Sequence, residues 1–132
     1  MKKNLVLGPF EGNTYLGLIG VKENSIYAIK LKMKSLIAYS INQQIPALFS
    51  NHFKDILAKS IDELILEYSF EKIKFDDIKN IKIVKSKFMN HAVIINSNSS
   101  KIKWNIIGSN MIENYESIFQ EILKEKFVPL KK

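Results

Sequence analysis

The sequence predicts one domain of the α+β class, with antiparallel strands, a helical insertion and a C-terminal helix. In several short segments apolar residues alternate with lysines, which is typical of strands with one buried face. The apolar spacing changes to a helical period in the middle of the chain and again near its end. The 132 residues contain no repeat and no linker, so residues 1–132 are expected to form a single domain.

Three strands are expected near the N-terminus, joined as a meander. They are residues 14–21, 26–33 and 36–41. The first is apolar throughout, as in a strand that is buried on both faces. In the second, Tyr27, Ile29 and Leu31 share one face, and Lys30 lies on the other.

A helical insertion is expected at about residues 43–68, after the third strand. Pro46 suits the first turn of a helix, and the apolar residues from Phe49 onward recur at helical spacing. Ser60 and Glu63 match a capping box, which can start a second helix. One kinked helix and two short helices both fit this pattern.

Four more strands are expected after the insertion. They are residues 70–75, 81–88, 92–96 and 101–107. In the second of these, the apolar parity slips from Ile83 to Val84, which predicts a bulge. In the last, Trp104 is expected to point inward, and Lys101 and Lys103 outward.

A C-terminal helix is the clearest helical pattern in the chain. Asn110 can cap its start, with Glu113 three residues on. One apolar stripe comprises Ile112, Tyr115, Phe119, Ile122 and Phe127. Pro129 marks the expected end of this helix.

The second half of the chain carries the features of a known class of domain. A strand leads into the turn Phe75-Asp76-Asp77-Ile78, and a later strand holds Trp104. The final helix contains Tyr115-Glu116-Ser117-Ile118-Phe119. In this order the features resemble the bacterial pleckstrin-homology-like (PH/GRAM-type) domains. The resemblance covers slightly under half of the chain. It implies a bent seven-stranded antiparallel barrel with a C-terminal capping helix, here with a helical insertion between strands 3 and 4.

The basic charge of the chain has two interpretations. All 20 basic residues are lysine, and with 13 acidic residues they give a net charge of +7. Such a charge favours an anionic partner, either nucleic acid or a membrane surface. Coding bias toward AT-rich codons also fits, because isoleucine and asparagine are abundant and arginine is absent. The lack of arginine weakens sequence-specific reading of DNA.

Two groups of lysines are candidates for contact with an anion. PH-like domains bind headgroups near the first hairpin, so the resemblance implies Lys22, Lys30, Lys32 and Lys34 as the anion-binding candidates. The second group comprises Lys79, Lys82, Lys85 and Lys87, which approach Lys101 and Lys103 if the strands pair as a meander. An ordinary solvent-exposed face, with edge lysines that discourage aggregation, is the favoured explanation of both groups.

The sequence contains no recognisable catalytic motif. Without cysteine, disulfides and cysteine-ligated metal sites are excluded. The two histidines are His52 and His91, and the spacing of His52 to Asp55 is too common to indicate a site. Asp76 and Asp77 are expected to cap a turn. We therefore expect no enzyme activity, no cofactor and no metal.

The function expected from the sequence is that of a cytoplasmic, non-enzymatic binding or adaptor module. No apolar run is long enough for a signal peptide or a membrane span. The expected partner is a protein, a second copy of the chain or an anionic surface, with Phe49 and Phe53 as candidates for a protein interface. The alternatives are an electrostatic nucleic-acid or membrane binder, and an enzyme with an unfamiliar site at His52 or His91.

Overall fold

Eight strands form one sheet in the computed structural model, which describes residues 5–12, 15–31, 59–85, 91–106 and 112–128. The strands are β1 (Leu5–Glu11), β2 (Leu16–Lys22), β3 (Ser25–Leu31), β4 (Ser69–Lys74), β5 (Ile78–Lys85), β6 (His91–Ser97), β7 (Lys101–Ile106) and β8 (Phe127–Val128). The helices are α3 (Ile61–Glu67) and α4 (Ile112–Leu123), with 3-10 turns η1 (Phe75–Asp77) and η3 (Lys124–Lys126). The predicted α+β class is confirmed.

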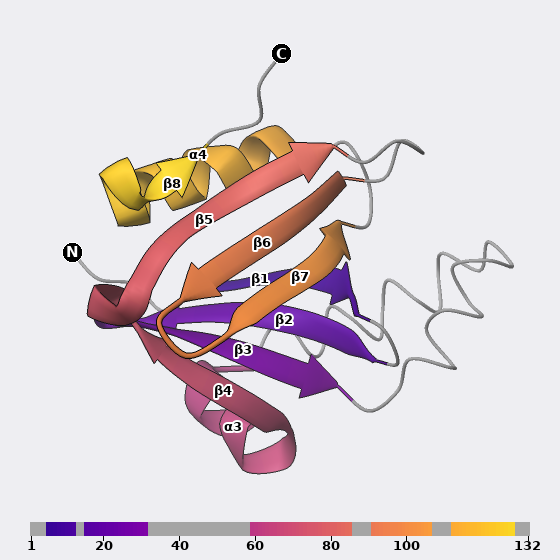
Figure 1. Cartoon of the computed structure of the whole chain (residues 1–132). Helices are drawn as coiled ribbons and strands as arrows, with labels where there is room; N and C mark the ends of the chain where they lie inside the picture. Colours follow the sequence, from indigo (N-terminus) through magenta and orange to yellow (C-terminus); the bar gives the residue numbers. More distant parts are fainter. Residues whose placement is uncertain (1–4, 13–14, 32–58, 86–90, 107–111, 129–132) are drawn as a thin grey trace, which may run out of the picture.

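The sheet is bent into two halves (Figure 1). Its strand order is β4-β3-β2-β1-β7-β6-β5-β8, and every pair is antiparallel except β5 with β8. We call β1–β4 the first half-sheet and β5–β8 the second half-sheet. They are joined where β1 pairs with β7, at Phe10 with Ile106 and at Glu11 with Asn105. Because β4 and β8 are the two edges, the sheet is not closed, and the predicted seven-stranded barrel is wrong in strand number and in closure.

Strand β1 was not expected from the sequence, because Gly8 and Pro9 resemble a break. The strand accommodates them at an irregularity, where the register with β2 shifts between Leu7 and Phe10. Gly8 has a φ of +136°, a conformation that side chains disfavour. The predicted strand at 36–41 lies outside the described residues, as does most of the helical insertion.

The main core lies between the two half-sheets and α4. Its largest buried side chains include Trp104, Phe10 and Tyr115, and the rings of Phe10 and Tyr115 are 5.1 Å apart. Gly17 lies directly under Trp104, since a Cβ atom at Gly17 would come within 2.6 Å of the indole ring. The inward orientation predicted for Trp104 is confirmed.

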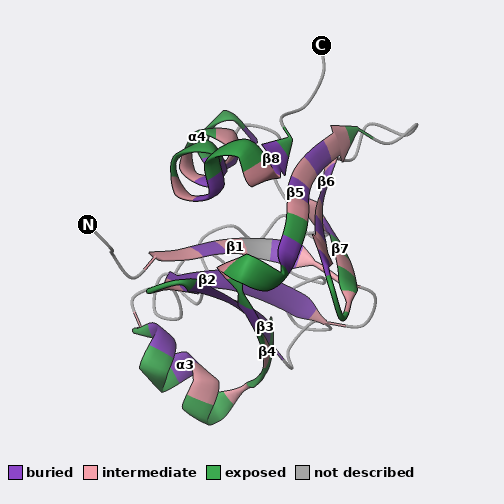
Figure 2. Cartoon of the chain, turned by 60° about the vertical axis from the view of Figure 1, so that its left-hand side comes forward, coloured by how far each residue is buried: buried purple, intermediate pink, exposed green. Residues whose placement is uncertain are grey.

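A second, smaller core covers the outer face of the first half-sheet. Figure 2 shows α3 packed beside β2 and β3, with its buried residues turned toward them. Leu18 and Ile29 are fully buried there, in contact with Ile61 and Leu64 of α3. Strand β2 is therefore buried on both faces, as the sequence predicted.

The predicted capping box at the start of α3 is confirmed. The hydroxyl of Ser60 accepts a hydrogen bond from the Glu63 backbone N–H at 3.2 Å, and the Glu63 carboxylate accepts one from the Ser60 N–H at 2.9 Å. These bonds satisfy two of the backbone donors that a helix start leaves open. The C-terminal part of the predicted insertion is therefore a separate short helix.

Two local predictions are corrected by the structure. Phe127 does not belong to the C-terminal helix, because α4 ends at Leu123 and Lys124 turns the chain at a φ of +55°. Phe127 instead pairs with Ile81 of β5 and packs against Phe119, with the rings 5.7 Å apart. The bulge expected near Val84 is absent, since the register of β5 with β6 is regular there and shifts between Ile78 and Asn80.

Candidate binding surface

The structure describes only part of the first group of candidate lysines. Lys22 and Lys30 belong to β2 and β3, whereas Lys32 and Lys34 lie outside the described residues, as do Phe49 and Phe53. Because Lys22 pairs with Ser25 across the turn, and Lys30 pairs with Gly17, they lie at opposite ends of the hairpin, about 17 Å apart along the strands. They also point to opposite faces of the sheet.

Both of these lysines have partners within the protein. Lys22 forms an ion pair with Asp62 of α3, and this hydrogen bond raises the pKa of Lys22 above its usual value. The ammonium of Lys30 lies over the ring of Tyr15, 5.2 Å from its centre. The described part of the hairpin therefore does not bring its lysines together around a common site.

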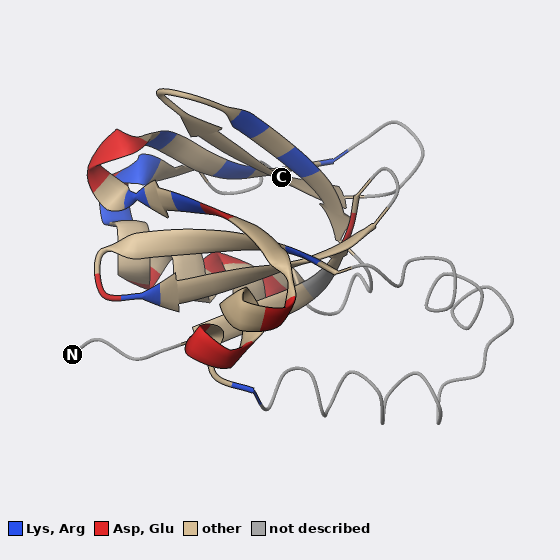
Figure 3. Cartoon of the chain, turned by 90° about the horizontal axis from the view of Figure 1, so that it is seen from below, with Lys and Arg blue, Asp and Glu red and all other residues tan. Residues whose placement is uncertain are grey.

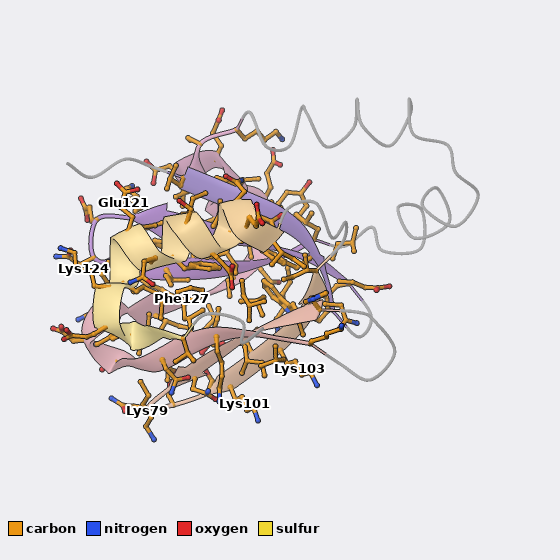
Figure 4. The ribbon with its side chains drawn as sticks, turned by 90° about the horizontal axis from the view of Figure 1, so that it is seen from above. Lys79, Lys101, Lys103, Glu121, Lys124 and Phe127 are labelled. Atoms are coloured by element: carbon orange, nitrogen blue, oxygen red, sulfur yellow. The ribbon has the colours of Figure 1, made fainter. Side chains whose placement is uncertain are left out.

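The second group of lysines gathers on the outer face of the second half-sheet. Strands β5, β6 and β7 pair as the predicted meander, which brings lysines of β5 and β7 to one surface, although Lys85 has the opposite orientation to Lys82. We call this surface the basic face, defined by Lys79, Lys82, Lys101 and Lys103. Figure 4 shows Lys79, Lys101 and Lys103 pointing to the same side of the sheet, away from α4.

The strand register gives the spacing of these charges. Lys82 and Lys103 both pair with Ile94 of β6, so they lie about 10 Å apart, two strand spacings. Lys101 and Lys103 follow each other along β7 at about 7 Å, two residues of strand rise. The basic face is therefore a grid of cations at intervals of roughly 7–10 Å on a rigid sheet.

Acidic residues are missing from these strands. Strands β5, β6 and β7 contain five lysines and no acidic residue. The other described parts of the chain contain seven lysines and twelve acidic residues. Figure 3 shows this separation, with blue segments on the second half-sheet and red ones on α3. The positive charge is thus concentrated on one half of the described molecule.

The lysines of the basic face have no ion pair within the described residues, whereas some lysines elsewhere have partners in the fold. Lys22 and Lys59 bind Asp62 and Glu67, and Lys126 donates to the Phe75 carbonyl at 2.7 Å. A cation without an internal partner keeps its full attraction for an external anion. The basic face therefore holds charges that the fold does not use.

Asparagines lie between the lysines. Asn80 and Asn96 occupy the same outer row as Lys101, and the Asn96 amide donates to the Asn80 oxygen at 2.8 Å. Asn105 follows Lys103 on the outer face of β7. Lysine and asparagine side chains are common donors to phosphate oxygens, so the face offers hydrogen bonds as well as charge.

The described residues contain no arrangement that indicates catalysis. No three His, Asp or Glu side chains among them could hold a metal ion together. His91 begins β6 at the rim of the sheet, opposite Lys85, and His52 lies outside the described residues. The carboxylate of Asp77 accepts from the Asn98 side chain at 3.4 Å, which ties η1 to the β6–β7 turn instead of capping its own turn.

A hollow beside the β2–β3 turn has a structural explanation. It is lined by Glu23, Asn24, Ser25, Lys74, Phe75 and Asp76. Across it, the Phe75 backbone N–H donates to the Asn24 carbonyl at 2.8 Å, which connects η1 to the turn. Its charges are mixed, so it has no clear preference for a charged ligand.

Comparison with known protein families and with curated proteins found no match to this chain. No described helix has the length and apolarity needed to cross a membrane. The candidate surface therefore rests on its own geometry.

The sequence identified the lysines of the basic face but did not show that they are better candidates for anion binding than the first group. The difference depends on Asp62, which is forty residues from Lys22 in the sequence and forms an ion pair with it in the fold. The asparagines were also missed, although their alternation with lysine along β7 was visible. An alternation of lysine and amide residues over paired strands is the signal that points to this surface.

Proposed function

We propose that this chain is a non-enzymatic binding module of the cytoplasm, and that its basic face binds an anionic partner. The observation that carries this proposal is the separation of charge: Lys79, Lys82, Lys101 and Lys103 share one face, and their strands carry no acidic residue. Like charges on one rigid surface create a field that attracts and orients polyanions.

The proposal also extends the resemblance to PH-like domains. Its support is the element order, a bent antiparallel sheet followed by a C-terminal helix against the core. In this proposal the binding surface differs from the one that the resemblance implies, because the hairpin lysines Lys22 and Lys30 have internal partners.

The test compares two variants with the same change in net charge. Lys101→Gln/Lys103→Gln removes two charges from the basic face, whereas Lys72→Gln/Lys74→Gln removes two equally spaced charges from the outer face of β4. On a column of immobilised heparin, the first variant should elute at distinctly lower salt than the wild type, and the second close to the wild type. Equal elution of the two variants would show that net charge alone causes retention, and the proposal would be wrong.

A further inference from the structure

The composition of the basic face restricts the kind of polyanion it suits, and this inference rests on the proposed function. Membranes, single-stranded nucleic acids and double-stranded nucleic acids are three cellular polyanions of high charge density. Each demands different chemistry from a protein surface. The side chains around the lysines therefore discriminate between them.

A membrane surface fits this face poorly. Proteins that lie on membranes combine basic residues with large apolar side chains that enter the headgroup layer. The large apolar side chains exposed in the described structure are Leu66, Phe70 and Val128, on α3, β4 and β8. Val128 pairs with Lys82 and so borders the basic face, but a single valine offers little apolar surface to enter the headgroup layer. Within the face, Ile94 lies half-buried between Lys82 and Lys103.

A single strand also fits poorly. Proteins that bind single strands stack the bases on exposed aromatic side chains, at about 1–3 kcal/mol per base. The described strands of the basic face contain one aromatic residue, Trp104, and it is 1% exposed and points into the core. Unpaired bases would therefore find no stacking partner on this face.

Of these three polyanions, the outside of a duplex fits the basic face best. Two strands fit into a major groove about 12 Å wide, but a face of three strands is too broad to enter it. Contact is then limited to the phosphates along the groove edges, which lysine and asparagine donors suit. Asn80 and Asn96 bind each other, so their amides are partly used and offer little reading of bases.

We infer that the basic face binds the phosphate backbone of double-stranded nucleic acid without sequence preference. The lysine grid contacts phosphates on both edges of a groove, and the asparagines donate hydrogen bonds to them. Four phosphate contacts give a slope of log K against log salt of about −3.6, so affinity should fall by roughly 100-fold between 50 and 200 mM salt.

The experiment measures binding of the full chain to fluorescent duplex DNA by anisotropy at several salt concentrations. Two duplexes of different sequence should bind with similar affinity and with a slope of about −3 to −4. Lys101→Gln/Lys103→Gln should weaken binding by about 10-fold or more at low salt and reduce the slope by about 2. The matched Lys72→Gln/Lys74→Gln variant should bind within about 2-fold of the wild type, since it leaves the counted phosphate contacts intact.

Competition separates this inference from the proposed function. A single strand of the same length, and vesicles containing phosphatidylserine, should each compete at least about 10-fold less well than unlabelled duplex. The single strand lacks paired phosphate edges, and the basic face lacks a large apolar anchor that could enter the vesicle surface. If either competes as well as the duplex while binding still depends on Lys101 and Lys103, the duplex inference is wrong and the proposed function stands. If no polyanion binds in a way that depends on these lysines, both are wrong.

Discussion

The two half-sheets have the same antiparallel construction but use their outer faces in different ways. In the first half-sheet, α3 covers the outer face of β2 and β3, where Leu18 and Ile29 are fully buried. In the second half-sheet, the outer face carries Lys82, Lys103 and the asparagines between them. One half therefore buries both of its faces, and the other leaves one face covered only by polar and half-buried side chains.

The lysines follow the same division. In the first half-sheet they serve the fold: Lys22 joins β2 to α3 through Asp62, and Lys72 lies 5.8 Å from the centre of the Tyr27 ring. In the second half-sheet the lysines of β5 and β7 have no such role among the described residues. The number of lysines alone thus does not single out a candidate surface, whereas the distribution of their internal partners does.

The largest expected difference between the halves comes from a lysine introduced at matched outer-face positions. Leu18→Lys places a charge under α3 without a partner, and we expect it to cost at least about 4 kcal/mol of unfolding free energy. Ile94→Lys places the same charge on a partly exposed side, between Lys82 and Lys103, and should cost about 1–2 kcal/mol, mainly through repulsion of like charges. Urea unfolding followed by the fluorescence of Trp104 measures both. Equal stability of the two variants would contradict the comparison.

A smaller effect tests whether α3 is a structural cover. Ile61 is fully buried against β2 and β3, whereas Leu66 on the same helix is 87% exposed. Ile61→Ala should cost about 3 kcal/mol, because it removes buried methyl groups and leaves a cavity. Leu66→Ala, the matched control, should change stability by less than about 0.5 kcal/mol. Similar losses for both would mean that α3 does not cover the sheet as described.

The smallest effect concerns α4, which attaches to the first half-sheet through Tyr115. Burial raises the pKa of Tyr115 from 10.0 to about 12, although a hydrogen bond from the Gly8 backbone opposes the shift. The unfolded chain then releases this proton first, so stability is complete below pH 10 and declines as the pH rises toward 12. The loss attributable to Tyr115 is up to about 2–3 kcal/mol.

Comparison with Tyr115→Phe isolates this contribution from the other groups that titrate in alkali. The difference in unfolding free energy between wild type and variant should be constant below pH 10 and should shift in favour of the variant between pH 10 and 12. A difference that stays constant over the whole range would show that the Tyr115 hydroxyl ionises as it does in an unfolded chain.

Much of the fold was predictable from local periodicity. The alternation in residues 101–106 placed the inward side chains correctly, and the capping pair Ser60 and Glu63 marked the start of α3. These features depend on neighbours within a few residues. They are therefore visible in a single sequence. In β3, Tyr27, Ile29 and Leu31 share a face as predicted. However, α3 covers that face, and Ile26 and Ala28 line the main core.

Several of the failures involve contacts between distant parts of the chain. Strand β1 exists because β2 and β7 flank it, although Gly8 and Pro9 disfavour a strand locally. Phe127 has helical spacing from Phe119, but it pairs with Ile81 at the edge of β5 and so belongs to a strand. The choice between the two groups of lysines likewise depended on Asp62, which reaches Lys22 only in the folded chain.

The junction of β1 with β7 has a consequence for the time course of folding. Within each half-sheet the paired strands are mostly close in sequence, but the junction joins Phe10 to Ile106 across most of the chain. Closing such a large loop costs conformational entropy before the stabilising contacts at the junction can form. Contacts between residues far apart in the sequence therefore slow folding. We expect each hairpin to form early and the junction to form late. Stopped-flow measurements on Phe10→Leu should then show faster unfolding with little change in the folding rate.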